Sequence, residues 1–495
     1  MIPIGLLQPP GREPRAARNG DAVAEDLGLA ELYNVMAGGD EFIAGVVKAI
    51  VPLSSTDCDV IRHRQGVLAD CCADPAMLRT CYTIATEATA VRRWTSGRGR
   101  EPRGKLGLAL QPLQALVGLL RQIRQNFEKS AGSCRSTGLD RLRRILTDQL
   151  DDDYLALLEH HVAALYFEHG MHFSAALGVG NKADRIMLHE PPAAAKRTLF
   201  GRRPGIAFEA FDNFEFHDGD PLRAVIEPPL DSVAELISRV TDNVQDFFRQ
   251  LRTELAFYLG CVNLHERLTA TGTPICFPEP VAAGETLLRT TDLRDVGLSL
   301  TASNVVGNDI DATGSTLLVV TGANSGGKST FLRSVGIAQL LMQAGIFVTA
   351  RSFTADLRDG VFTHFVRGED PAMTHGRLDE ELTRMRAITD RMSGTAMLLC
   401  NEPFASTDDR DAAALADPIV SALLDSGVKI VLVTHLYEFA HRRHVAGHGT
   451  DLFLRAQRDS DGRRTYRLIV GAPEPTSHGL DIFRRIFADH QVGDG

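Results

Sequence analysis

The stretch between residues 317 and 342 constrains the fold of this chain more than any other. An apolar segment, Leu317 to Val320, leads into a glycine-rich loop, and a second apolar segment follows from Phe331 to Met342. This order predicts a β-strand that turns into a loop and opens an α-helix. The residues that fit the phosphate-loop spacing G-x-x-x-x-G-K-[ST] are Gly322, Gly327, Lys328 and Ser329.

The residue types in this loop suit a nucleotide triphosphate. Glycines let backbone N–H groups converge on phosphate oxygens without Cβ clashes, and the start of a helix adds partial positive charge. Lys328 supplies a charge for the β- and γ-phosphates, and the Ser329 hydroxyl can hold Mg²⁺. The alternative is a glycine loop that binds no nucleotide; the flanking strand and helix disfavour it. The predicted nucleotide-binding residues here are Gly322, Ala323, Asn324, Ser325, Gly326, Gly327, Lys328, Ser329 and Thr330.

A second apolar segment, Thr395 to Cys400, ends in Asn401 and Glu402. P-loop ATPases carry an acidic pair at such a strand end, where the first residue helps to hold Mg²⁺ and the second polarises the attacking water. Glu402 therefore is a candidate general base. Asn401 offers a carbonyl oxygen to Mg²⁺ but no negative charge, so the predicted ATP hydrolysis is slow.

A third apolar segment, Val431 to Val433, runs through Thr434 to His435. A lone histidine is more often a core or surface residue than a catalytic one. Its place at the end of a further sheet strand, after Glu402, favours a second interpretation. In that interpretation the imidazole contacts the γ-phosphate and senses hydrolysis.

Composition places the 495 residues among ordinary globular proteins, with 44% hydrophobic and 23% charged residues. No segment is apolar enough to predict a membrane span, and no apolar leader precedes residue 21. We therefore expect a cytoplasmic protein, and this expectation is compatible with association with the nucleoid. The net charge of −10 argues against a surface that coats nucleic acid nonspecifically, though not against a local basic groove. The eight cysteines form no C-x-x-C pair, which leaves a zinc site unsupported.

Along the chain, periodicity predicts three parts. Residues 1–21 are expected to be disordered. Residues 22–284 are expected to be mostly helical, with an irregular or β insert at about 176–230. Residues 285–495 alternate strands and helices, as an α/β P-loop sheet does. The predicted fold is therefore multidomain, a helical region followed by an α/β domain. The segments expected to be strands in the last part are 287–289, 298–300, 317–320, 360–365, 397–400, 429–433 and 466–469.

A basic loop from Arg92 to Lys105 carries six positive residues and one negative residue. Two interpretations stay open. The loop could contact a phosphate backbone, with Trp94 as a stacking platform, or it could be a solvated surface loop.

Together these motifs resemble the ATPase domain of the MutS family, in the wider ABC class. Residues 322–330 look like the family's G-P-N-M-G-G-K-S-T, and residues 434–439 resemble its T-H-Y-F-E-L. Residues 477–480 resemble its S-x-G-[IL] segment, and the helical part is similar to its core and lever region. The resemblance implies an adenine contact for Asn304, ATP and Mg²⁺ as cofactors, Mg²⁺ held by Ser329 and Asn401, a homodimer, and DNA as partner.

Departures from the family pattern are also present. The Ser of the family's S-T-F-M-x-E signature corresponds to Gly376 here, although Glu381 fits its Glu. Ser406 and Thr407 fall two positions earlier than the family's Ser-Thr, whereas Asp411 matches its Asp. We expect neither a mismatch-reading domain before the helical part nor a C-terminal Smr domain.

The resemblance and the motifs lead to two hypotheses. The first is a MutS-like, ATP-dependent DNA-binding ATPase in DNA repair or in recognition of a mismatch-repair-related DNA structure. The second is an ATP-binding switch or scaffold with weak hydrolysis that binds a protein or RNA partner. Asn401, Gly376 and the acidic net charge motivate the second hypothesis. The missing L-S-G-G-Q signature disfavours a transporter ATPase.

Overall fold

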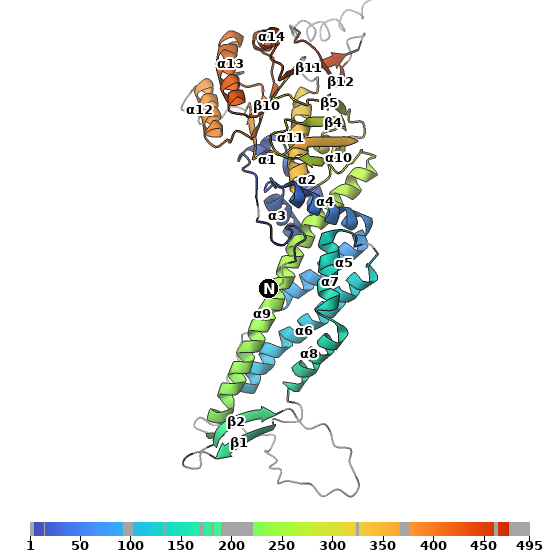
Figure 1. Cartoon of the computed structure of the whole chain (residues 1–495), viewed down its shortest axis with the longest axis vertical. Helices are drawn as coiled ribbons and strands as arrows, with labels where there is room; N and C mark the ends of the chain where they lie inside the picture. Colours follow the sequence, from blue (N-terminus) through green and yellow to red (C-terminus); the bar gives the residue numbers. More distant parts are fainter. Residues whose placement is uncertain are drawn as a thin grey trace, which may run out of the picture. The chain divides into compact units, whose positions relative to one another are not determined.

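The computed structural model of the chain has a mixed helical and α/β architecture (Figure 1). It divides into two compact units. Unit 1 comprises Met1–Ile4, Ala76–Cys134 and Asp140–Arg252, and unit 2 comprises Gly5–Pro75, Arg135–Leu139 and Thr253–Gly495. The residues that the structure describes are 4–13, 15–92, 102–132, 134–167, 172–177, 179, 183–189, 221–322, 326–366, 376–459 and 464–474.

Unit 1 is built from helices that bury one apolar face each. Leu106, Leu110 and Leu113 on one helix meet Leu155 and Val162 on another, and all are almost fully buried. Removing such faces from water is the main force that holds amphipathic helices together. The helices of unit 1 are α5 (Pro75–Ala90), α6 (Pro102–Lys129), most of α7 (Thr137–Asp148), α8 (Asp152–Ala164) and the first part of α9 (Pro221–Ala270).

The expected insert at about 176–230 is only partly a β element. An antiparallel hairpin forms from β1 (His172–Leu177) and β2 (Ala183–His189), and residues 190–220 lie outside the described part of the chain. The segment 222–226, expected to be a strand or irregular, is helical, because α9 starts at Pro221 and continues through Pro228 and Pro229. Packing explains this difference: Leu230 is 2% exposed and joins the core of unit 1, so burial outweighs the hydrogen bonds that the prolines cannot make.

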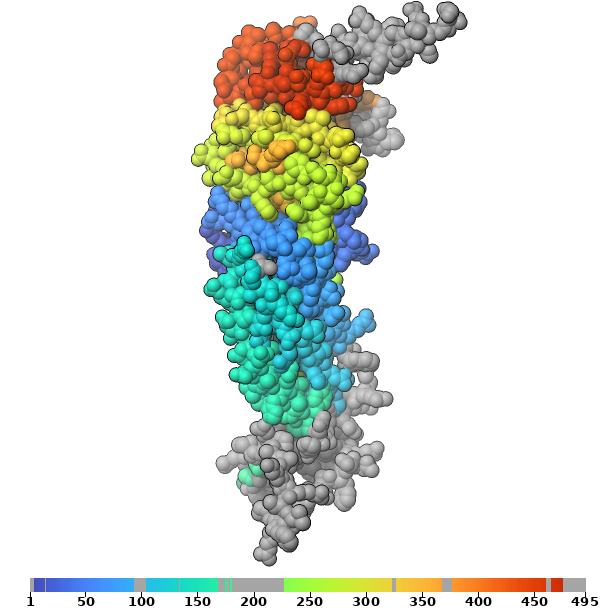
Figure 2. All heavy atoms as spheres, turned by 90° about the vertical axis from the view of Figure 1, so that its right-hand side faces the viewer, coloured from blue at the N-terminus to red at the C-terminus, as the bar shows by residue number. Residues whose placement is uncertain are grey.

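Unit 2 begins with four helices that local sequence signals delimit. Asp40 caps the start of α3 by accepting hydrogen bonds from the N–H groups of Phe42 and Ile43, and Gly38 ends α2 in a left-handed conformation. Figure 2 shows this blue N-terminal segment beside the yellow-green segment that holds strands of the same unit. The helices are α1 (Val23–Asp26), α2 (Leu29–Ala37), α3 (Glu41–Ile50) and α4 (Cys58–Ala73).

A six-stranded sheet forms the centre of unit 2, with the strand order β12-β11-β6-β10-β9-β8. The strands from β8 to β11 are parallel, and β12 runs antiparallel to β11 at the edge. Burial on both faces accounts for their apolar sequences. The strands are β6 (Leu317–Thr321), β8 (Val361–Phe365), β9 (Met397–Asn401), β10 (Lys429–Val433), β11 (Asp451–Arg458) and β12 (Arg464–Val470).

Helices cover both faces of this sheet. Leu398 belongs to a core shared with α12 (Arg377–Thr389), α13 (Asp409–Asp425) and α14 (Tyr437–Ala446). The next residue, Leu399, faces α11 (Lys328–Ala344), where a Cβ on Gly336 would come within 2.4 Å of its side chain. Alternate side chains of a strand point to opposite faces, so one strand serves both cores.

A smaller sheet with the order β3-β7-β4-β5 completes unit 2. The prediction of a strand at 298–300 is wrong, because these residues lie in helix α10 (Val296–Thr301). Asp295 accepts a hydrogen bond from the N–H of Leu298 and so caps the helix. The prediction relied on the short apolar run alone and did not take this capping residue into account. The strands of this sheet are β3 (Glu279–Val281), β4 (Leu288–Leu293), β5 (Asn308–Asp311) and β7 (Ser352–Asp356).

The end of α11 is fastened to α4. Gly345 ends the helix with φ of 82°, and a Cβ at this position would lie 2.4 Å from the Cβ of Arg64. The Arg64 guanidinium donates to the carbonyl oxygens of Ala344 at 3.2 Å and of Leu7 at 2.8 Å. A glycine is therefore required twice over at position 345, by its backbone conformation and by the close approach.

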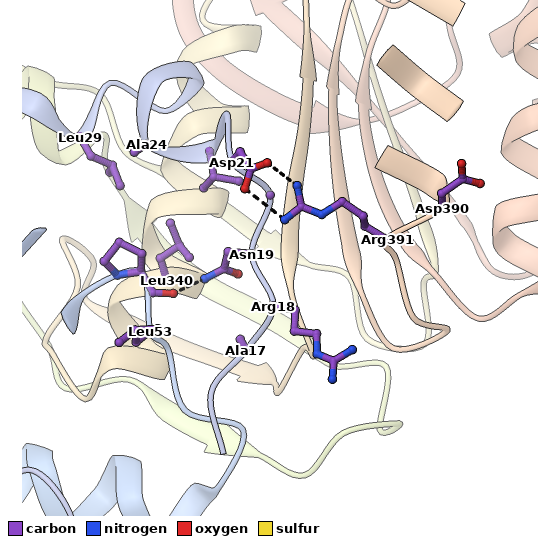
Figure 3. Close-up of a pocket in the computed structure, with 13 residues that line it drawn as sticks. Ala17, Arg18, Asn19, Asp21, Ala24, Leu29, Leu53, Leu340, Asp390 and Arg391 are labelled. Carbon is purple, nitrogen blue, oxygen red and sulfur yellow. Dashed lines mark hydrogen bonds and ion pairs between the residues drawn. The ribbon is translucent and has the colours of Figure 1, made fainter. Parts of the chain in front are cut away.

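The N-terminal residues differ from the expectation of a disordered segment. Within the described part, Arg18 N–H donates to the Asp359 carbonyl, and the Asn19 side chain accepts from Val361 N–H at 2.7 Å. Asp21 forms an ion pair with Arg391, drawn in Figure 3. Because β8 is an edge strand, its unpaired backbone groups provide partners that composition alone does not reveal. None of the described helices is long and apolar enough to cross a membrane.

Candidate functional site

Three strands of the six-stranded sheet end at one edge of unit 2. β10 lies between β6 and β9, all three are parallel, and Val433 pairs with both Val320 and Asn401. The segments that follow them therefore lie at the same carboxyl edge, where open α/β sheets bind ligands. All three segments that the sequence predicted to act together follow these strands, although even the two nearest residues, Glu402 and His435, are 33 positions apart in the chain.

The glycine-rich loop leaves β6 at Gly322 and enters α11 at Gly327. Gly322 has φ of 120°, and a Cβ there would lie 2.9 Å from the Cβ of Ala456 on β11; Gly327 has φ of 93° and caps α11. Both positions need glycine because L-residues rarely adopt these conformations. Gly326 is buried between them, whereas the predicted contacts Ala323, Asn324 and Ser325 lie outside the described residues.

Lys328 is the first residue of α11 and is 4% exposed. Its ammonium donates a hydrogen bond to the Gly322 carbonyl at 2.6 Å and lies 3.4 Å from a carboxylate oxygen of Glu402. A buried lysine needs such partners, because an isolated charge is costly to remove from water. The predicted phosphate-binding lysine and the predicted base are thus in contact.

Ser329 and Asn401 meet in front of the strand ends. The Ser329 hydroxyl donates to Asn401 Oδ1 at 2.9 Å, and both side chains are accessible to solvent. A hydroxyl and an amide carbonyl oxygen are hard ligands of the kind that Mg²⁺ prefers, and Mg²⁺ usually keeps several waters besides such protein ligands. The donor set therefore fits a magnesium ion that is only partly held by protein.

Glu402 and His435 form the polar centre of the site. A Glu402 oxygen accepts from the His435 backbone N–H at 3.0 Å and contacts the ring Nδ1, while the ring Nε2 lies 3.5 Å from Asp409. The sequence did not point to Asp409. Its only signal was a pair of aspartates, Asp408 and Asp409, at the start of an amphipathic helix, which by itself indicates a helix cap.

These contacts shift the pKa of both groups. Burial alone would raise the pKa of Glu402, but the hydrogen bond from His435 and the charge of Lys328 outweigh it, so the pKa is lowered. The hydrogen bond to Glu402 raises the pKa of His435 in spite of partial burial. The site therefore pairs a carboxylate whose pKa is lowered with an imidazole whose pKa is raised.

A cavity of about 380 Å³ adjoins the start of α11. Asn304, for which the family resemblance implied an adenine contact, lines it together with Thr330 and the apolar side chain of Phe331. Tyr466, at the edge strand β12, contributes to the wall and adopts φ of 59°, which is rare for an aromatic residue. The sequence suggested only a strand at Tyr466, because nothing local indicates that it faces the phosphate loop.

Other predicted features lie apart from this centre or outside the description. Gly376 is the cap residue of α12, and Asp411 lies in the first turn of α13. The Ser406 hydroxyl donates a hydrogen bond to Glu381, the residue that the family resemblance aligns with the Glu of the S-T-F-M-x-E signature. Most of the basic loop, including Trp94, and residues 477–480 lie outside the described residues.

Two family models match the chain. The model of the MutS2 N-terminal domain matches residues 56–271, and the model of MutS domain V matches residues 318–492. Together they cover both the helical region and the sheet with its strand-end residues.

Curated relatives agree with these models. Endonuclease MutS2 of Thermus thermophilus is 31% identical over 180 residues, which is 36% of this chain and 23% of that protein. Endonuclease MutS2 of Listeria welshimeri is 30% identical over 192 residues, 38% of this chain and 24% of that protein. DNA mismatch repair protein MutS of Chloroflexus aurantiacus is 26% identical over 259 residues, 49% of this chain and 27% of that protein. The chain thus spans about a quarter of the length of these relatives.

Proposed function

The chain belongs to the MutS family, and on this premise we propose that it is an ATP-dependent DNA-binding ATPase acting in DNA repair or in recognition of a repair-related DNA structure. One observation carries the proposal. Lys328 and Ser329, at the start of α11, touch Glu402 and Asn401 at the end of β9. A phosphate-binding lysine, two metal-type oxygen ligands and a carboxylate at one sheet edge are the parts that phosphoryl transfer requires.

We propose that ATP and Mg²⁺ bind at this edge. The backbone and side chains from Gly322 to Thr330 would hold the phosphates, and the cavity with Asn304 and Tyr466 has apolar and polar walls suited to a nucleobase. Ser329 and Asn401 would hold Mg²⁺. Supporting this assignment, Lys328 is already buried and oriented by the Gly322 carbonyl, so little side-chain entropy would be lost on binding.

Glu402 is the proposed general base and His435 the proposed γ-phosphate sensor. The lowered pKa of Glu402 keeps it ionised at neutral pH, which a proton acceptor needs, but also makes it a weaker base. Asn401 leaves the proposed metal site without the charge of an aspartate. Both features favour slow hydrolysis, with ATP bound for long periods.

DNA as partner and a homodimer as active form are part of the proposal. The curated relatives are named as a DNA mismatch repair protein and as endonucleases, which supports DNA as the partner class. We propose that the reaction takes place in the cytoplasm. Residues 285–495 are proposed as the ATPase domain and residues 22–284 as the core and lever region.

The proposal is tested by ATP turnover measured without DNA and with duplex, mismatched or branched DNA. Wild type should turn over ATP, and at least one DNA should change the rate. Glu402→Gln should bind ATP and trap it, because it lacks the base, whereas Lys328→Ala should lose nucleotide binding. Tight ATP binding by Lys328→Ala would reject the phosphate-loop assignment, and unchanged turnover by Glu402→Gln would exclude Glu402 as base.

A second candidate function is an ATP-binding switch or scaffold with weak hydrolysis that binds a protein or RNA partner. The amide of Asn401 at the proposed metal site and the net charge of −10 favour it. The two candidates differ in DNA binding: steep salt dependence of affinity for duplex DNA supports the first. ATP binding without DNA affinity at low salt supports the second.

A further inference from the structure

The turn after β9 has a strained backbone. Glu402 has φ of 54° and Phe404 has φ of 62°, although neither is a glycine. Such left-handed conformations are unfavourable for L-residues and persist only where the surroundings enforce them. Contacts with neighbouring elements must therefore enforce the conformation of the turn that carries the proposed base.

Both the backbone and the side chain of Glu402 are held by neighbouring groups. Its backbone N–H donates to the Val433 carbonyl at 2.9 Å, so the sheet ladder continues into the turn. Its carboxylate reaches Lys328 and His435. Neither contact restrains the residues that follow, where the chain must turn away from the sheet edge.

Glu381 on α12 supplies that restraint. One carboxylate oxygen accepts the Phe404 backbone N–H at 2.6 Å, and the other accepts the Ser406 hydroxyl at 2.8 Å. Glu381 is only 8% exposed. A buried carboxylate is costly unless its oxygens are hydrogen-bonded, so its two oxygens tie it to this turn.

The rest of the surroundings leave this arrangement little freedom. Phe404 is 2% exposed in the core beneath α12 and α13, and its ring lies 6.1 Å from that of His364 on β8. His364 in turn contacts the Glu381 backbone carbonyl. Anchored on both sides, Glu381 fixes the direction in which the chain leaves Glu402.

We propose that Glu381 is a positioning residue of the hydrolytic site: its buried carboxylate holds the turn from Glu402 to Ser406 so that the Glu402 carboxylate points at Lys328 and His435. The inference rests on the proposed function for its catalytic consequence. Its structural consequence, the contact between Glu402 and His435, is measurable without turnover. Glu381 touches neither Lys328 nor Ser329 through any contact of the described residues, so it acts through the turn.

The test compares Glu381→Gln with Glu380→Gln, a matched change at an exposed neighbour on the same helix. Glutamine keeps the shape but offers only one acceptor oxygen for two donors. In Glu381→Gln we expect kcat to fall about tenfold or more, while KM and the affinity for a non-hydrolysable ATP analogue stay within about threefold. Glu380→Gln should behave as wild type.

A second readout does not depend on turnover. If the turn relaxes, Glu402 withdraws from His435, and the His435 pKa, followed by NMR of the ring, should fall toward 6.5 in Glu381→Gln. Ser406→Ala removes one donor and keeps the Phe404 bond, so it should show smaller changes in the same direction. It also serves as the test if Glu381→Gln does not fold.

The outcomes separate the inference from the proposed function. A wild type that hydrolyses no ATP while Glu381→Gln lowers the His435 pKa rejects the function and supports the positioning role. An active wild type with unchanged kcat and unchanged His435 pKa in Glu381→Gln overturns the positioning role alone. A kcat loss matched by an equal loss of nucleotide affinity also overturns it, because the whole site would then have collapsed.

Discussion

At the scale of single residues, Glu402 is the point where the other site residues meet. Its carboxylate lies between the Lys328 ammonium and the His435 ring, and its backbone extends the sheet. The hydrogen bond between Glu402 and His435 raises the pKa of His435 and opposes the effect of burial on the pKa of Glu402. The protonation of Glu402 and that of His435 are therefore linked, and pH experiments can measure this link.

The contact between His435 and Glu402 should stabilise the protein in a defined pH window. The pKa of His435 is raised above 6.5, so its contribution is fully present below pH 6.5 and is lost as pH rises through the raised value. The pKa of Glu402 is lowered below 4.5, so its contribution is present above pH 4.5 and is lost as pH falls through the lowered value.

We therefore expect His435→Gln to lower the urea unfolding midpoint most between pH 4.5 and 6.5, and progressively less at alkaline pH. His448→Gln, at an exposed histidine outside the site, is the control. A midpoint difference that does not depend on pH would show that the ion pair is not formed.

The amide of Asn401 should limit metal binding. Asn401→Asp places a carboxylate next to the Ser329 hydroxyl, and ligand charge raises affinity for hard divalent cations. The Mg²⁺ concentration for half-maximal ATP turnover should fall by about tenfold, whereas Asn401→Ala should raise it. Equal Mg²⁺ dependence in wild type and both variants would remove Asn401 from the metal site.

At the scale of elements, α11 connects the proposed nucleotide site with the N-terminal helices of unit 2. It begins at Lys328 in the site and ends at Ala344, where Arg64 of α4 binds its last carbonyl oxygen. The Gln343 backbone carbonyl and side chain bind the backbone of Ser55 as well. A displacement of α11 on ligand binding would therefore also move α4 and the backbone at Ser55, to which the helix is hydrogen-bonded.

The close contact at Gly345 gives this connection a direct test. Gly345→Ala adds a Cβ in a left-handed backbone and in conflict with Arg64, so it should cost about 2–4 kcal/mol of unfolding free energy. Gly272→Ala is the matched control, with φ of 67° but open space around the position, and should cost only about 1 kcal/mol. Urea unfolding measures both; equal costs would mean that Arg64 is not packed against the helix end.

At the scale of the whole molecule, the proposed activity depends on a second copy of the chain and on DNA. Unit 2 contains all described residues of the proposed site, and unit 1 contains helices and a hairpin. We propose that two copies of the chain bring their phosphate loops face to face, which would couple ATP binding to DNA binding. Trapped ATP should then favour association.

We expect Glu402→Gln to sediment as a dimer with ATP and Mg²⁺ and as a monomer without nucleotide. DNA affinity, measured for the same variant across salt concentrations, should be higher in the ATP state. A variant that stays monomeric at micromolar concentration with bound ATP would contradict the dimer proposal, while leaving the nucleotide assignment intact.

The sequence by itself determined what local chemistry can determine. The spacing from Gly322 to Ser329 indicated a phosphate loop because glycine conformations and helix starts are set within a few residues. Apolar runs indicated strands at β6, β9 and β10, and the polar residues after them lie at the same sheet edge. Each of these inferences needed only a short window of the chain and the rule that parallel strands end together.

Tertiary structure decided what depends on distant partners. The N-terminal residues gained order from an unpaired edge of β8, and α9 continued through two prolines because Leu230 reached a core. The Glu381 carboxylate accepts a hydrogen bond from the backbone of Phe404, 23 positions along the chain, and Asp409 lies beside the ring of His435. Such contacts follow from strand order and packing, and the free energy of burial that selects them is not encoded in any short segment.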